Sequence, residues 1–209
     1  IQSCESGIKE HFKKNNYFAI SSNIIAMLFE VNNIIYHKQK SIGVRLEDLK
    51  QNPTATIRAI CNWMGIKETP SLYEMTVQGK KWWGDPTSPD YAMDGMEPFG
   101  KVSINRSLGA IFSENDQFIL KTLFYPFSLR FGYVAERETQ FRDDLNSIKP
   151  KLNEMFDFEK VIARRTKVEQ KDFMKSGPYL YLRSGLIERW NTLDSEGTYP
   201  NMIHPLRID

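Results

Sequence analysis

The chain has 209 residues, 41% of them apolar and 26% charged, which is typical of one globular body or of a domain with an appendage. Its 28 Lys and Arg against 26 Asp and Glu leave a formal charge of only +2, too little for a field that would by itself attract nucleic acid or an anionic membrane. Any phosphate site must therefore be local.

Cysteines and histidines exclude two further classes of protein. Cys4 and Cys61 are too few for a disulfide framework, and no Cys or His has the spacing of metal ligands. We therefore expect no metal and a reducing, cytoplasmic location. The longest apolar stretch, residues 24–28, is far shorter than the roughly 20 residues that a membrane span requires, so we expect no membrane span.

The first elements are predicted by apolar spacing. Apolar residues recur every three or four positions over residues 18–38, which predicts one helix with an apolar face. Side chains alternate over residues 42–46, which predicts a short strand, the only convincing one in the chain. A helix then begins after Asn52 with Pro53 in its first turn and ends at Gly65. A lone strand exposes unpaired backbone groups, so we expect an N-terminal part outside this sequence, or a partner chain, to complete a sheet.

An irregular segment separates this part from the next helix. Residues 79–109 are rich in Gly, Pro, Asp and Ser, which is typical of a long functional loop. Trp82 and Trp83 within it indicate either a loop anchor or a stacking surface for a ligand. Ser113 is predicted to cap a helix that Pro126 kinks or restarts.

The last third of the sequence is predicted to be helical. Residues 135–176 are dense in charges of both signs, with Pro150 between two expected helices and a narrow apolar stripe at Leu145, Ile148, Leu152, Met155 and Phe156. This pattern indicates a helical arm or an oligomer contact. A final helix carries a docking face of Tyr179, Leu182, Leu186, Trp190 and Leu193.

Two motifs resemble the sulfotransferases that use 3′-phosphoadenosine 5′-phosphosulfate (PAPS). Arg45-Leu46-Glu47-Asp48-Leu49, followed by Asn52-Pro53 and a helix that ends in Met64-Gly65, is similar to that family's R-Y-E-D-L strand end and D/N-P helix. The Ser113-Glu114-Asn115-Asp116 helix start and the Arg130-Phe131-Gly132-Tyr133 ending resemble its S-P-E-x and R-x-G-Y motifs. The resemblance covers about residues 18–133.

The resemblance implies an α/β fold around a P-loop-like parallel sheet, of which this chain would be the mostly helical C-terminal half. Residues 1–133 would belong to the sulfotransferase domain, and residues 134–209 would form a helical extension and an extended tail. The family's phosphosulfate loop, P-x-S-G-T/S, is absent from this sequence, and its catalytic base would lie upstream of Ile1. We therefore expect the chain alone to be inactive.

The resemblance also implies a cofactor site in the late loop. Family members hold the 3′-phosphate of PAPS just before the Ser-capped helix, where this chain has Lys101, Ser103 and Arg106. A point charge, a hydroxyl and a planar guanidinium suit a phosphate, although scattered basic residues are also ordinary on a hydrated loop. Leu46 replaces the Tyr with which many members reach the adenine.

The expected function is transfer of a sulfonyl group from PAPS to a hydroxyl or amine of a small-molecule acceptor. Glu47 and Asp48 offer a general acid and base, but adjacent carboxylates point apart and more often cap backbone amides. The alternative function is a non-catalytic helical interaction module. The helical extension is in addition a candidate contact for a homo-oligomer. Nucleic-acid binding is disfavoured because basic and acidic residues are interleaved.

Overall fold

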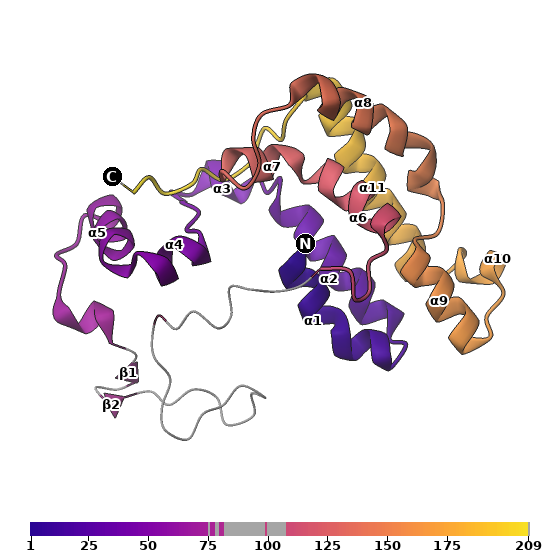
Figure 1. Cartoon of the computed structure of the whole chain (residues 1–209), viewed down its shortest axis with the longest axis horizontal. Coiled ribbons are helices and arrows are strands. Elements are labelled where there is room, and N and C mark those ends of the chain that lie inside the picture. Colours follow the sequence, from indigo (N-terminus) through magenta and orange to yellow (C-terminus); the bar gives the residue numbers. More distant parts are fainter. Residues whose placement is uncertain (75, 78–79, 82–98, 100–107, 209) are drawn as a thin grey trace. The chain divides into compact units, whose positions relative to one another are not determined.

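A computed structural model describes residues 1–74, 76–77, 80–81, 99 and 108–208 (Figure 1). The chain divides into two compact units. The first unit comprises Ile1–Ser41 and Arg106–His204, and the second comprises Ile42–Asn105 and Pro205–Asp209. The boundary predicted after residue 133 concerns a family domain and stays a prediction.

The first unit is a bundle of helices around one apolar core (Figure 1). α2 and α11 pack against each other, and α1 packs on α2. The helices of this unit are α1 (Gln2–Lys13), α2 (Tyr17–Glu30), α3 (Ile35–Lys38), α6 (Glu114–Leu123), α7 (Tyr125–Arg130), α8 (Glu138–Ile148), η2 (Lys149–Asn153), α9 (Asp157–Thr166), α10 (Gln170–Phe173) and α11 (Gly177–Glu196).

The helix predicted over residues 18–38 is wrong in its extent, because α2 ends at Glu30 and α3 is a separate turn. The helix breaks at Asn32 and Asn33. The side chains of these two residues accept hydrogen bonds from backbone N–H groups outside α2. The Oδ1 of Asn33 accepts from Ile35 N, and the Oδ1 of Asn32 accepts from Asn201 N. The predicted face is confirmed in α2, where Ile20 and Ile24 are fully buried.

The stretch Tyr17–Lys38 is the one segment, in the part of the chain that the structure describes, that is long and apolar enough to cross a membrane. Composition alone is weak evidence, because the core helix of a globular protein passes the same test. α2 has 14 residues, fewer than the roughly 20 that a span requires, and its apolar face lies in the core. We therefore interpret α2 as a core helix.

The apolar stripe and the last helix face pack into this same core. All five stripe residues and all five residues of the predicted docking face are buried. The Nε1 of Trp190 donates to Leu145 O at 2.8 Å, which joins α11 to α8. The two predicted apolar faces are thus confirmed, and other helices of the same chain cover them.

The second unit contains α4 (Leu46–Gln51), α5 (Pro53–Met64), η1 (Pro70–Tyr73), β1 (Thr76–Val77) and β2 (Lys80–Lys81). The two strands are antiparallel and pair Thr76 with Lys81 and Val77 with Lys80. Buried side chains are few among its described residues, with Thr56, Ile57 and Cys61 on the inner face of α5.

The predicted α/β fold is contradicted, because the described residues are mostly helical and contain no parallel sheet. The strand predicted over residues 42–46 is wrong as well. Only Gly43 makes a bridge, to Pro205, where Leu206 N donates to Gly43 O at 2.7 Å, and Leu46 already begins α4. Glu47 and Asp48 occupy the first turn of α4, where the helix dipole favours negative charge, so the helix begins before a strand can extend.

Truncation of Leu182 in the core is expected to lower the free energy of unfolding by about 2–5 kcal/mol, because the change removes apolar contacts and leaves a cavity. Leu180 lies on the same helix and is 55% exposed, so Leu180→Ala is the matched control, with an expected change of about 0.5 kcal/mol or less. Denaturant unfolding of Leu182→Ala and Leu180→Ala measures both, and equal losses would contradict this core.

Candidate functional site

The three predicted cofactor residues, Lys101, Ser103 and Arg106, lie outside the described residues, as do Trp82 and Trp83. The phosphate site therefore stays a prediction, and the structure informs the segments on either side of it. In the described part of the chain, no cluster of His, Cys, Asp and Glu is suited to hold a metal ion.

The motif that carries the resemblance lies at the start of the second unit. Arg45 precedes α4, and its Nε lies 3.5 Å from Oδ2 of Asp48 in an ion pair. Both Asp48 and Glu47 lie in the first turn of α4. These contacts favour the structural interpretation of the two carboxylates over a general acid and base, because they serve a helix start.

The next helix forms as its sequence predicts. Pro53 is the first residue of α5, and Asn52 accepts at its backbone oxygen from the Thr56 backbone N at 3.0 Å and hydroxyl at 2.8 Å. The Asn52 side chain makes no cap hydrogen bond, so this helix start rests on Pro53 and on backbone bonds. Gly65 ends the helix at φ 69°, in the left-handed region that favours glycine.

The segment that follows the candidate loop is fixed by a buried carboxylate from α1. The backbone N–H groups of Gly109, Ile111 and Phe112 donate to the carboxylate oxygens of Glu5 at 2.9, 2.7 and 2.8 Å. Glu5 is only 2% exposed, so each of these bonds forms where water does not compete. Sequence reasoning missed this contact, which joins residues more than a hundred positions apart and has no local pattern.

Ser113 then starts α6 with the predicted cap. Its hydroxyl accepts from Asp116 N at 3.1 Å, and the Asp116 carboxylate accepts from Ser113 N in return. Asp116 also accepts from Asp157 N at 2.8 Å, so one buried carboxylate serves the starts of both α6 and α9. Burial raises the pKa of Asp116, and the amide donors oppose that shift.

A second buried polar cluster joins α2, α9 and α11. Glu159 accepts from Tyr17 Oη at 2.5 Å and from Phe156 N at 2.8 Å, and it pairs with Arg183. The Arg183 guanidinium lies over the rings of Phe156 and Tyr179, 4.6 and 4.5 Å from their centroids. Burial and the nearby carboxylate raise the pKa of Tyr17, which keeps its hydroxyl a donor. We therefore interpret this cluster as structural, because it links three helices of the first unit.

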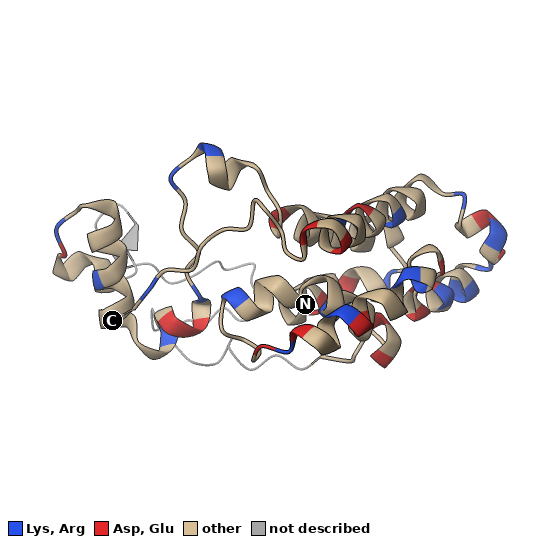
Figure 2. Cartoon of the chain, turned by 90° about the horizontal axis from the view of Figure 1, so that it is seen from above, with Lys and Arg blue, Asp and Glu red and all other residues tan. Residues whose placement is uncertain are grey.

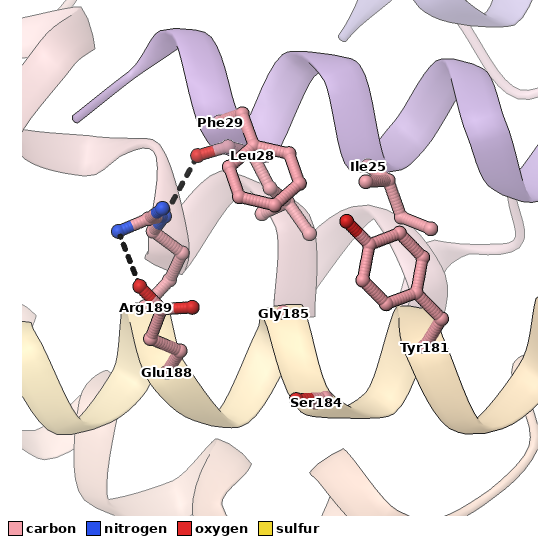
Figure 3. A pocket seen from close by; sticks show the side chains of 8 residues that line it. All are labelled: Ile25, Leu28, Phe29, Tyr181, Ser184, Gly185, Glu188 and Arg189. Atoms are coloured by element: carbon pink, nitrogen blue, oxygen red, sulfur yellow. Dashed lines mark hydrogen bonds and ion pairs between the residues drawn. The ribbon is translucent and has the colours of Figure 1, made fainter. Parts of the chain in front are cut away.

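The described residues also form a small hollow between α2 and α11 (Figure 3). At its wall the Arg189 Nε donates to Leu28 O at 2.7 Å, and Nη1 lies 3.4 Å from the Glu188 carboxylate. The cavity volume of about 30 Å³ holds roughly one or two waters, far less than a nucleotide. It is lined by Ile25, Leu28, Phe29, Tyr181, Ser184, Gly185, Glu188 and Arg189.

Neither cysteine offers a nucleophile. Cys61 is buried, and burial raises the pKa of the Cys4 thiol to about 11, so that thiol is protonated at neutral pH.

No family model, no curated protein and no solved structure matches this chain. Its function is therefore argued from its own residues.

Replacement of Glu5 by Ala is expected to lower the free energy of unfolding by about 2–4 kcal/mol, because three backbone N–H groups lose their acceptor. Hydrogen exchange at Gly109, Ile111 and Phe112 should accelerate more than exchange in α11. Glu10→Ala, on the exposed side of α1, is the control and should leave stability essentially unchanged, because its ion pair with Lys13 is open to solvent. Unchanged exchange at those three amides in Glu5→Ala would contradict the anchor.

Replacement of Arg183 by Met is expected to destabilise the fold by about 3–5 kcal/mol, because Glu159 is left as an uncompensated buried charge. The double variant Glu159→Gln/Arg183→Met removes both charges and should recover much of that loss. Thermal and denaturant unfolding of the two single variants and the double variant give the coupling free energy. Strictly additive losses would show that the two side chains do not act as a pair.

Proposed function

We propose that this chain carries part of the nucleotide site of a PAPS-dependent sulfotransferase. The reaction would be a direct displacement, in which an acceptor hydroxyl or amine attacks the sulfur atom. The bond from sulfur to the 5′-phosphate oxygen then breaks, and adenosine 3′,5′-bisphosphate leaves while the acceptor proton passes to a base. In such a reaction the protein holds the reactants in line and stabilises the charge on the departing phosphate.

The observation that carries the proposal is the order of two sequence motifs on either side of the candidate loop. Each motif is formed by interactions between residues close in the sequence. Upstream, the Arg45–Asp48 ion pair and α5 with its Pro53 start and Gly65 end occupy the positions of the family's R-Y-E-D-L and D/N-P motifs. Downstream, Ser113 caps α6 where the family has its Ser-capped helix. The proposal rests on this resemblance of motifs alone, because no known family or protein matches the chain.

Within the proposed site, Lys101, Ser103 and Arg106 would hold the 3′-phosphate. The described segment that follows them in the sequence is anchored where Gly109, Ile111 and Phe112 donate to Glu5.

A second candidate, a non-catalytic helical interaction module, is favoured by a different observation. The described residues of the first unit form a self-contained helical core whose small hollow cannot admit a nucleotide. Such a module would ignore adenosine nucleotides altogether, so one titration separates the two candidates.

Calorimetric titration of the 209-residue chain with adenosine 3′,5′-bisphosphate is expected to show weak binding that is tighter than binding of adenosine 5′-monophosphate. Lys101→Ala/Arg106→Ala should remove that preference, with a loss of about 10–100-fold for the bisphosphate alone, because only this ligand has the 3′-phosphate. Lys121→Ala, an exposed lysine on α6, is the control. Equal, undetectable binding of both nucleotides would refute the proposed function and favour the interaction module.

A further inference from the structure

One end of the first unit carries an excess of basic side chains. From residue 164 to residue 175 there are five basic and two acidic residues, all exposed, whereas the whole chain has an excess of only +2. These residues lie in α9, in the turn after it, in α10 and directly after α10, at the right-hand end of Figure 2. The basic members are Arg164, Arg165, Lys167, Lys171 and Lys175.

The C-terminal end of α1 adds to this surface. Arg165 lies with its guanidinium 4.7 Å from the centroid of the Phe12 ring, and its Nη1 donates to Phe12 O at 3.5 Å. The exposed Lys13 and Lys14 directly follow Phe12. The ends of α1 and α9 therefore bring their cations to the same end of the unit.

Exposed apolar side chains lie among these cations. Val168 is 42% exposed and Met174 36%, and each has a lysine beside it in the sequence. Phe18, 69% exposed, follows Tyr17, whose ring lies 4.6 Å from that of Phe173 in α10. A single exposed apolar residue is ordinary. Three exposed apolar residues beside seven basic residues form an amphipathic surface.

The backbone at Lys167 is a second indication that this end has a role. Lys167 ends α9 at φ 57°, in the left-handed region, where glycine is the least strained residue. A lysine at this position keeps a charge at the tip of the turn at some cost in stability. Strain of this kind is often found where a side chain is used.

The helix dipole does not account for the whole surface. The C-terminus of a helix is equivalent to about half a negative charge, so one cation suffices for each of α1 and α9. The ion pairs Lys13–Glu10 and Lys175–Asp172 are exposed and therefore weak. A net positive surface remains, and the apolar side chains have no part in complementing a dipole.

We propose that this end of the first unit, defined by Lys13, Lys14, Phe18, Arg164, Arg165, Lys167, Val168, Lys171, Met174 and Lys175, binds the surface of an anionic membrane. Cations would pair with lipid headgroups while Phe18, Val168 and Met174 enter the interface, a combination typical of peripheral membrane contacts. Nucleic acid fits less well, because the aliphatic side chains of Val168 and Met174 gain little beside phosphates. The contact is independent of the proposed nucleotide site.

Sedimentation of the chain with vesicles tests the proposal. Vesicles of phosphatidylcholine with about one third phosphatidylserine should bind the chain, pure phosphatidylcholine vesicles should not, and added NaCl should weaken binding. Lys167→Glu/Lys171→Glu should lower the partition coefficient by about 25-fold or more, since each lysine near such a surface contributes about fivefold. Lys38→Glu/Lys121→Glu carries the same charge change on α3 and α6 and should bind like the wild type.

Two further variants separate membrane binding from folding. Lys167→Gly relieves the left-handed strain, so its thermal midpoint should rise while its binding falls about fivefold. Phe18→Ser keeps every charge and should also weaken binding. Equal binding by the 167/171 and 38/121 variants would overturn the proposal, as would absence of binding to phosphatidylserine vesicles. Retention of the chain by duplex DNA or polyglutamate with no vesicle binding would overturn it as well.

Discussion

The Glu159 carboxylate is the contact on which the packing of the first unit most depends. It accepts from Tyr17 at the start of α2 and from Phe156 N at the start of its own helix, and it pairs with Arg183 on α11. Apolar contacts hold these helices together, but they are non-directional and tolerate sliding. Hydrogen bonds to a buried carboxylate are directional, so we infer that Glu159 with its three donors fixes the register of α2, α9 and α11.

Buried acids perform a related task elsewhere in this unit. Glu5 serves the turn at Gly109–Phe112, and Asp116 serves the starts of α6 and α9. In each case a carboxylate supplies the acceptor that backbone amides need when they leave water. The burial of Glu159 also takes a negative charge away from the surface of α9. What this helix shows to solvent is therefore more basic than its sequence suggests.

How much of this was predictable depended on the range of the interactions involved. The α5 helix was predicted well because Pro53 and Gly65 act on their own backbone. The apolar stripe of residues 145–156 was recognised, but a stripe does not say what covers it, and α11 and α6 do so. The roles of Glu5 and Glu159 were missed because a carboxylate in a charge-rich sequence looks the same whether it is buried or solvated.

The wrong strand and the retained motif have a common explanation. Five alternating residues are compatible with a strand and equally with an extended approach to a helix, and the carboxylates of Glu47 and Asp48 favour the helix. The motif around Arg45 is thus a local unit, formed by an ion pair, a helix start and a glycine end, none of which requires a particular sheet. For that reason, the contradiction of the predicted α/β fold concerns the fold alone. The hypothesis of a nucleotide site is tested by binding measurements. A 3′-phosphate is recognised by the donors that reach it, and whether Lys101 and Arg106 do so is a question about one loop.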